Sequence, residues 1–584
     1  MLTPEYLEGL PEEILKLYQK AEEEILADMA RKIASYDYWM PATDWQYRKL
    51  REAGQVSEEI LRVLSQKTGK TRAELRKLMQ QAVKTSLRLD ESIYRAVGVT
   101  GEPLASSEAL RNILNTGYRA TMQTMLNLTR TTARTASQQF ERALDKAWMK
   151  VTSGAFSTDA AVKGAVKELS EKGLESIEYP SGRRDTLEVA VRRAVVTGVN
   201  QTCGQIQLER AKQMGADLME LTAHEGARPT HAEWQGQIVS LSGQPGYLSL
   251  EDIGYGTVTG FKGANCRHDW NPWFEGMPRT WTPEALAKLN EPKYEYKGEK
   301  LTQYEASQIQ RYNERQIRRW KREYTAMKAA GQETTEASAK LAEWNKRQDD
   351  FLKQTGFKRR QSREEIEGFS WRNQKAASEE AIARNKMLSE FRGKMEDAGY
   401  QLEGFDTYYG DRATLEHMSS SMERMSQLYP EEAKGVTVRW GYHKDDTTYG
   451  WYDPRDGSIS FNKNALGKWN KVEKEYEGLV GSRYFPAGTN ADSIFIHEFG
   501  HRVWHAHGGG SLGKAVKSIF EQLGYGYISS KQQMLELPIV LSGYAAKTTV
   551  PAFQEAIAEA FSEYYNSLTA REFCKRLLKE VGLI

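Results

Sequence analysis

Residues 493–507 read SIFIHEFGHRVWHAH and contain the pattern His497-Glu498-x-x-His501. In a helix, residues four apart lie on one face, so the two imidazoles can occupy adjacent corners of a zinc tetrahedron. Glu498 can then take a proton from the metal-bound water. The apolar lead-in at residues 493–496 predicts a buried helix. We predict a catalytic Zn²⁺ site; the alternatives are a buried histidine pair with other partners, and a metal site without catalysis.

A third protein ligand is expected in residues 550–567, VPAFQEAIAEAFSEYYNS. Glu555 and Glu559 are one helical turn apart, so one carboxylate can bind zinc while the other orients a ligating histidine from behind. We predict Glu555 as the ligand and Glu559 as the orienting group, with the reverse assignment left open. The competing interpretation is a solvated glutamate face that continues to Glu563.

His507, ten residues after His497, is a further candidate for the third ligand. Trp504 stands where a bend in the helix would need glycine, so the helix should stay straight and keep His507 away from the metal. We therefore rank His507 below the glutamates.

The region around this helix, residues 381–584, reads as a separate α+β domain. Strand-like runs at 436–444 and 450–462 precede helices from 491 onward, and Asp453-Pro454-Arg455-Asp456-Gly457 supplies a turn. The run GSISFN at 457–462 is a candidate edge strand to which a substrate peptide could pair.

Residues 494–503, IFIHEFGHRV, and 541–565, LSGYAAKTTVPAFQEAIAEAFSEYY, resemble the zinc metalloprotease domain of anthrax lethal factor and its relatives, which are gluzincins. The resemblance implies a zincin-like fold and a zinc metalloendopeptidase acting on a protein or peptide. Its implied residues are the ligands His497, His501 and Glu555, the general base Glu498, the second acidic residue Glu559, and Tyr544, which hydrogen-bonds the oxyanion.

The 584 residues allow about three or four domains. We predict a multidomain chain with a mainly α region at 1–178, a small α+β module at 179–285, a charged helical linker at 286–380 and the zincin-like domain at 381–584. Helical periodicity over residues 3–174 and glycine-rich turns between residues 218 and 276 support the first two divisions.

Four N-terminal segments, at residues 179–202, 222–243, 254–277 and 308–324, resemble phage minor capsid protein 2, a family related to the Mu-type minor head proteins. The resemblance covers about residues 1–370. It implies a phage or prophage head protein in the virion, made in the bacterial cytoplasm and partnered with the portal and other head proteins. The peptidase would then be cargo, delivered to the host cytoplasm as an effector. The alternative is a purely structural head protein with an inactive or structural-zinc C-terminal domain.

Metal-capable side chains also cluster in the predicted module, at His224, His231, Cys266 and His268. One reading is a tetrahedral site of one cysteine and three histidines. The other, which we favour from the sequence, is a hydrogen-bonded loop core packed by Trp234 and Trp270.

The overall charge argues against a dedicated DNA-binding protein, because 81 Lys+Arg against 79 Asp+Glu leave a net charge of +2. A local basic helix at 304–330 permits weak DNA contact, although a solvated helix with internal ion pairs is favoured. Its basic residues are Arg311, Arg315, Arg318, Arg319, Lys321 and Arg322. Three dispersed cysteines predict a reducing compartment, and no apolar run predicts a membrane span.

Overall fold

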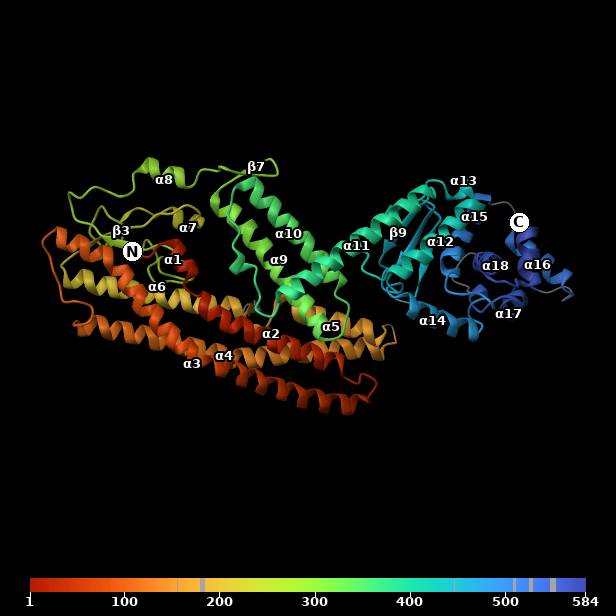
Figure 1. Ribbon diagram of the computed structural model, residues 1–584, viewed down its shortest axis with the longest axis horizontal. Coiled ribbons are helices and arrows are strands. Elements are labelled where there is room, and N and C mark those ends of the chain that lie inside the picture. The colour runs from red at the N-terminus through yellow and green to blue at the C-terminus, as the bar shows by residue number, and fades with distance from the viewer. Residues whose placement is uncertain (155, 179–183, 446, 508–510, 525–528, 547–552) are drawn as a thin grey trace. The chain divides into compact units, whose positions relative to one another are not determined.

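The computed structural model describes residues 1–154, 156–178, 184–445, 447–507, 511–524, 529–546 and 553–584. The chain divides into two compact units, the first formed by Met1–Ser153 with Ser157–Ser378 and the second mainly by Glu379–Ile584 (Figure 1). The division falls within the helix α11 (Trp371–Asp397). The expectation of a mainly helical chain with small sheets is confirmed.

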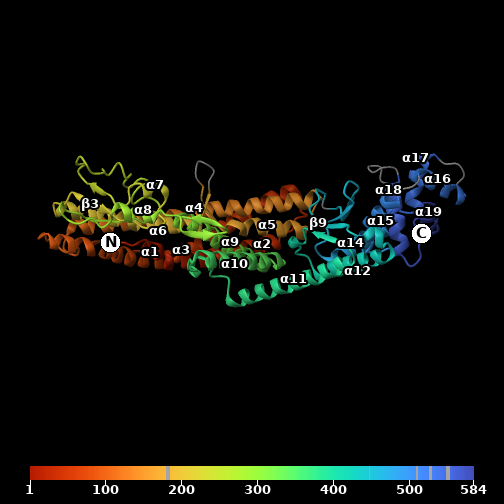
Figure 2. The same cartoon turned by 90° about the horizontal axis from the view of Figure 1, so that it is seen from above.

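The first unit is built on long helices, of which α3, α4 and α6 run side by side (Figures 1 and 2). Apolar residues at three- and four-residue spacing, such as Val56, Ile60, Val63 and Leu64 in α3, face a common core. The helices are α1 (Pro4–Gly9), α2 (Glu12–Ala34), α3 (Ala42–Ala96), α4 (Glu108–Thr152), α5 (Thr158–Lys172) and α6 (Leu187–Gln213).

Helices α4 and α6 approach closely because glycines on each face threonines on the other. A Cβ on Gly117 would lie 2.2 Å from Thr202 Oγ1, and a Cβ on Gly198 would lie 2.2 Å from Thr121 Oγ1. Only glycine leaves room for this reciprocal contact. The small β1 (Glu175–Glu178) and β2 (Arg184–Thr186) pair antiparallel before α6, and the predicted boundary at 178/179 adjoins residues 179–183, which lie outside the described residues.

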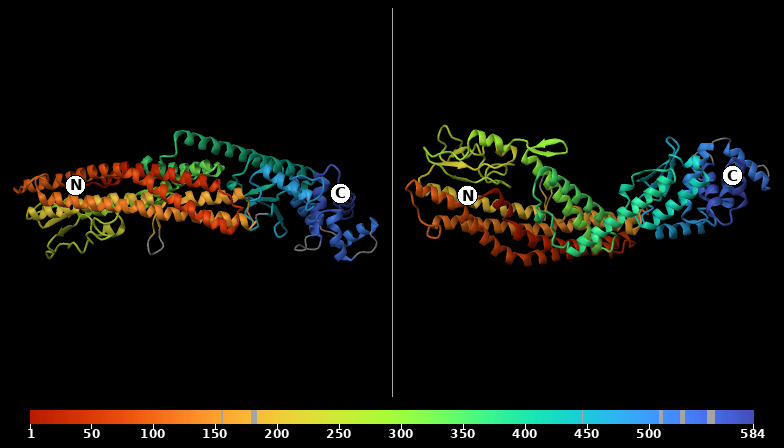
Figure 3. Two further views of the ribbon diagram at one scale, coloured as in Figure 1. Left: turned by 90° about the horizontal axis from the view of Figure 1, so that it is seen from below. Right: turned by 45° about the horizontal axis from the view of Figure 1, so that its top comes forward.

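A loop-rich module follows α6 and lies against one end of the long helices (Figure 3). Its three-stranded antiparallel sheet has the order β4-β3-β5 and its own core, which includes Trp234, Phe261 and Trp270. The elements are β3 (Leu218–Leu221), α7 (Pro229–Ala232), β4 (Ile238–Ser240), β5 (Trp270–Pro272) and α8 (Pro283–Leu289).

Residues 286–380 are packed rather than linker-like, which differs from the expectation for this segment. Helix α9 (Gln303–Ala329) contacts α2, α5 and α10 (Thr335–Thr355), and it buries Ile317, Trp320 and Tyr324. A hairpin of β6 (Tyr294–Tyr296) and β7 (Glu299–Leu301) precedes it. These apolar residues on a strongly charged helix explain why it packs as part of the first unit.

Buried carboxylates on α2 lead to a pH-dependent prediction. Burial, together with the neighbouring Glu22, raises the pKa of Glu23 to about 8. An unfolded glutamate titrates near about 4.3, so the folded state holds a proton that the unfolded state releases, and stability falls as pH rises between these values. We expect Glu23→Gln to raise the melting temperature relative to the parent near about pH 9 and to change it little near about pH 5.

Thermal melting of the full chain at both pH values checks this expectation, with Glu24→Gln as the control because Glu24 is the exposed neighbour. An equal difference between Glu23→Gln and the parent at the two pH values would contradict it.

The second unit contains a four-stranded sheet in the order β10-β11-β9-β8. Strands β8, β9 and β11 are parallel, whereas β10 is antiparallel to β11 and lies at one edge. The strands are β8 (Gln401–Glu403), β9 (Thr437–Gly441), β10 (Gly450–Asp453) and β11 (Ser458–Asn462). The prediction of GSISFN as an edge strand is therefore wrong: β11 is paired on both sides, and all five of its residues are buried.

Helices cover this sheet and form one hydrophobic core with it. Helix α15 contacts β10 and β11, and α18 packs against α15. The remaining helices are α12 (Arg412–Leu428), α13 (Pro430–Ala433), α14 (Trp469–Gly481), α15 (Ser493–His507), α16 (Leu512–Gln522), α17 (Ser530–Val540), α18 (Gln554–Asn566) and α19 (Glu572–Glu580). The C-terminal unit is thus α+β in composition.

Candidate metal centre

The centre lies where α15 and α18 pack together. Residues 493–501 on α15 are all buried, as their apolar lead-in predicts. Gly500 allows the close approach, because a Cβ at this position would lie 3.1 Å from the Cβ of Phe561 on α18. The contact brings the N-terminal turn of α18, with Glu555, to the histidines of α15.

Three donor atoms converge there. His497, His501 and Glu555 each offer one atom, and these atoms lie within 4.8 Å of one another. Glu555 Oε2 is 3.2 Å from His497 Nε2 and 3.6 Å from His501 Nε2. The three residues are at most 8% exposed. Sequence positions 54 residues apart therefore meet in one buried group.

A hydrogen-bond chain orients His497 from behind. Glu559 Oε1 lies 2.8 Å from His497 Nδ1, and Glu559 Oε2 accepts a hydrogen bond from the Ser542 hydroxyl at 2.7 Å. Because the Nδ1 proton is directed at a carboxylate, His497 Nε2 is the atom turned toward Glu555. Ser542 was not identified from the sequence. Its position three residues before Ala545, which is buried, is the feature that could have pointed to it.

Glu498 and Tyr544 flank the donor group. Glu498 is buried, and its side chain packs against β10, since a Cβ on Gly450 would lie 2.9 Å from Glu498 Cγ. The ring of Tyr544, in the short 3-10 turn Tyr544–Ala546, has its centroid 5.8 Å from that of His497. Tyr452 on β10, another residue that the sequence analysis missed, stacks at 6.3 Å on His501. The predicted residues are thus brought together with β10 beside them.

The pKa shifts of Glu498 and Glu555 agree with a buried site that contains charged groups. Burial raises the pKa of Glu498, and Glu555 and Glu559 raise it further against the opposing effect of the histidines. Burial alone would raise the pKa of Glu555, but the adjacent imidazoles of His497 and His501 outweigh this effect and hold that pKa below its usual range. Glu555 is therefore a carboxylate at neutral pH.

The structure also tests His507 as third ligand and the interpretation of the glutamates as a solvated face. His507 Nε2 lies 2.6 Å from Glu432 Oε1, and His507 is about half exposed, so it lies outside the donor group. Glu563 is fully buried in an ion pair with Arg571. The interpretation of Glu555, Glu559 and Glu563 as a solvated stripe is therefore wrong, because all three face the interior.

The donor set fits a zinc ion. Glu555 Oε2 is a buried oxygen that has no hydrogen-bond partner among the described residues, although two imidazole nitrogens lie nearby. Two imidazoles and one carboxylate, with a carboxylate behind one histidine, are the donors and support that catalytic zinc uses. A cation between the three atoms would satisfy the otherwise unpartnered oxygen.

Comparison with known proteins concerns the first unit. The family model described as phage minor capsid protein 2 matches residues 2–353, which is more than half of the chain. The chain belongs to the phage minor capsid protein 2 family. The resemblance seen in the N-terminal sequence is thereby confirmed, and the chain is a phage minor capsid protein.

A relative of this minor capsid protein supports the same conclusion. A structural protein of Lactococcus phage LL-H is 23% identical over 249 residues, which cover 40% of this chain and 67% of that protein. No solved structure matches the chain. The matched family segment ends before the second unit, so the candidate metal centre lies outside it.

The basic helix of the minor capsid protein directs most of its charge inward. Arg318 lies 3.2 Å from Glu188, Arg319 lies 3.4 Å from Glu171, and Lys321 donates to the Glu364 carbonyl. Arg322 is buried and Arg311 half-buried, which leaves Arg315 as the exposed member of these six described residues. The favoured interpretation as a solvated helix is wrong, because its ion partners come from other helices and segments of the first unit.

None of the described helices is both long and apolar enough to cross a bilayer.

Proposed function

We propose that this phage minor capsid protein carries a zinc-dependent peptidase in its second unit and docks at the portal of the phage head through its first. One observation supports the peptidase most strongly: the buried convergence of His497, His501 and Glu555, with Glu555 Oε2 unpartnered among the described residues. The sequence resemblance to lethal factor-type metalloproteases agrees with this donor set.

Each residue has a separate role in the proposed hydrolysis. Zinc, when bound, would polarise the scissile carbonyl and activate a water. Glu498 accepts a proton from that water and passes it to the leaving amine. Tyr544 donates a hydrogen bond to the carbonyl oxygen of the substrate as charge develops there. Glu559 holds His497 in the tautomer that leaves Nε2 free.

The substrate is proposed to be an extended peptide paired with β10. This strand is at the sheet edge and its Gly450 touches Glu498, so a peptide added along it would pass the general base. Backbone pairing would give affinity for many sequences, and side chains around β10 would set the preference. We also propose that the peptidase is cargo, which the phage delivers into the host cell.

Metal removal tests the proposal on the full chain. We expect the zinc-loaded protein to cleave members of a random peptide library, to lose this activity in a zinc chelator and to regain it when zinc is restored. His507→Ala is the matched control, because this histidine lies on the same helix but outside the donor group. Zinc that binds without any cleavage, and whose removal only lowers the melting temperature, would instead assign a structural ion.

A further inference from the structure

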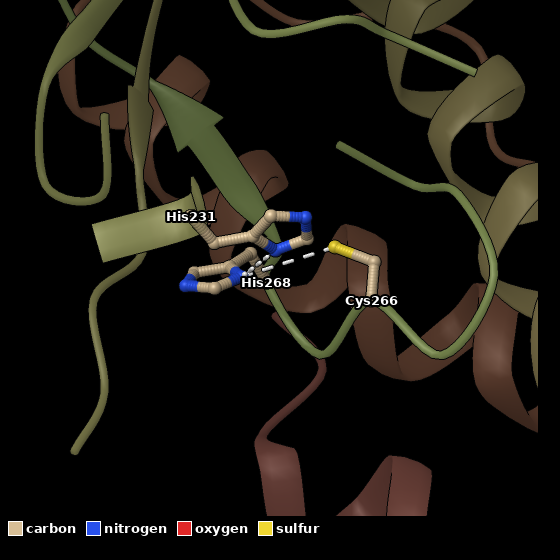
Figure 4. A group of neighbouring side chains, drawn as sticks. All are labelled: His231, Cys266 and His268. Atoms are coloured by element: carbon tan, nitrogen blue, oxygen red, sulfur yellow. Dashed lines mark hydrogen bonds between the residues drawn. The ribbon is translucent and has the colours of Figure 1, made fainter. Parts of the chain in front are cut away.

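A second group of metal-capable side chains lies in the loop-rich module of the first unit. His231 on α7 meets Cys266 and His268, which precede β5, and the three donor atoms lie within 4.8 Å of one another (Figure 4). All three residues are at most 2% exposed. The group is independent of the candidate centre in the second unit.

The hydrogen bonds around the two histidines fix which ring nitrogens carry protons. His231 Nε2 is 2.8 Å from the Thr259 carbonyl oxygen, which can only accept, so Nε2 holds the proton of the neutral ring. His268 Nε2 lies 3.2 Å from Gln235 Oε1. That atom also accepts from the His224 backbone N–H, which identifies it as the amide oxygen, so His268 Nε2 is likewise the donor.

Both Nδ1 atoms are therefore bare in the neutral rings, yet they face each other at 3.3 Å. Two lone pairs at this distance repel, and burial disfavours a proton that would give one ring a charge. A cation between them removes the conflict. Two nitrogens bound to a tetrahedral zinc at about 2.05 Å lie about 3.3 Å apart, and a nitrogen and a sulfur about 3.6 Å apart. Cys266 Sγ is 3.8 Å from His268 Nδ1.

Backbone N–H groups are directed at the sulfur of Cys266. Burial raises the pKa of the Cys266 thiol, and backbone hydrogen bonds from His268 and Lys262 oppose this shift in part. Donors directed at the sulfur are the usual support of a metal-bound cysteine. One thiolate with two imidazoles is a donor set that suits zinc rather than a hard cation.

His224 is placed beside this group but outside it. Its Nδ1 contacts the Glu225 carbonyl oxygen at 2.9 Å, so its Nε2 is bare, and that atom is buried without a hydrogen-bond partner among the described residues. Its ring packs on His268 with centroids 4.3 Å apart.

We propose that His231 Nδ1, His268 Nδ1 and Cys266 Sγ bind one structural zinc ion. The site is buried, and it joins the four-residue helix α7 to the end of residues 241–269, which contain no helix or strand. A metal cross-link at the end of so long a segment without a helix or strand would stabilise the module.

Cobalt substitution in the full chain tests this site apart from the peptidase centre, which has no cysteine ligand. We expect Co²⁺ added to metal-free protein to give near-ultraviolet thiolate-to-cobalt charge-transfer absorption. Cys266→Ser should abolish this band and lower the bound zinc by about one ion per chain. Cys203→Ser, a buried cysteine on α6, and the double variant His497→Ala/His501→Ala should keep the band.

Absence of the band in the cobalt-saturated parent protein would overturn the proposal, as would a band that persists in Cys266→Ser. If Cys266→Ser does not fold, the parent spectrum and the Cys203→Ser spectrum decide the question. Loss of peptide cleavage in His497→Ala/His501→Ala with the band retained would show two separate metal sites.

Discussion

Glu498→Gln is expected to lower kcat/KM for peptide cleavage by about 10² to 10⁴-fold while the protein keeps its bound zinc. The amide has the shape of the carboxylate, so the packing of this side chain against Gly450 survives. The amide cannot accept a proton from the attacking water, and the proton-transfer step therefore loses its base. The metal donors His497, His501 and Glu555 are unchanged by the substitution.

The measurement pairs steady-state cleavage of a selected peptide with zinc analysis of the same full-length preparation. Glu521→Gln is the control, since Glu521 is an exposed glutamate of the same unit. Full activity in Glu498→Gln with zinc retained would remove Glu498 from the role of base. Loss of zinc together with activity would instead show that the residue supports the metal group.

Local spacing explains why much of the candidate centre could be predicted. Positions i and i+4 of a helix share a face in any fold, so His497 and His501 needed only a helix to meet. The same rule places Glu559 one turn beyond Glu555. The residues that contact each helix face could not be predicted from the sequence. The hydrogen bond from Ser542 to Glu559 and the ion pair of Arg571 with Glu563 depend on how α18 packs.

The order of the strands was harder to predict from the sequence, for the same reason. The hairpin turn between β10 and β11 was predicted from local residues, but the pairing of β11 with β9 is a non-local contact that leaves β10 at the edge. The interpretation of the charged helix α9 as solvated was wrong for a similar reason. Glu188 and Glu171, which pair with its arginines, lie more than a hundred residues earlier in the chain. The charge of a segment and its alternation of polar and apolar residues do not indicate which other segment packs against it.

Lys262→Met is expected to destabilise the loop-rich module by about 3–5 kcal/mol, because it leaves an uncompensated buried charge. Lys262 Nζ lies 2.7 Å from Asp269 Oδ1, and both side chains are fully buried. The ammonium also donates to Asn200 Oδ1 at 3.0 Å, and Asp269 accepts from the Leu2 backbone N–H. The pair thus ties the loop to α6 and to the start of the chain.

Hydrogen–deuterium exchange of β3 and β5 in the full chain, alongside denaturant unfolding, measures the effect. The expected loss corresponds to exchange faster by about a hundredfold to a few thousandfold where opening of the module limits exchange. The double variant Lys262→Met/Asp269→Asn is the matched control. It removes both charges and should recover part of the stability, since no unpaired carboxylate remains.

The same pair bears on the proposed zinc site, because Lys262 and Asp269 bracket Cys266 and His268 in the sequence. If opening of this loop is what the ion pair prevents, Lys262→Met should also weaken cobalt binding, and the double variant should restore part of it. Unchanged exchange in Lys262→Met would mean that the ion pair contributes little to the stability of the module. The stability of the module would then rest on its aromatic core around Trp270 rather than on the ion pair.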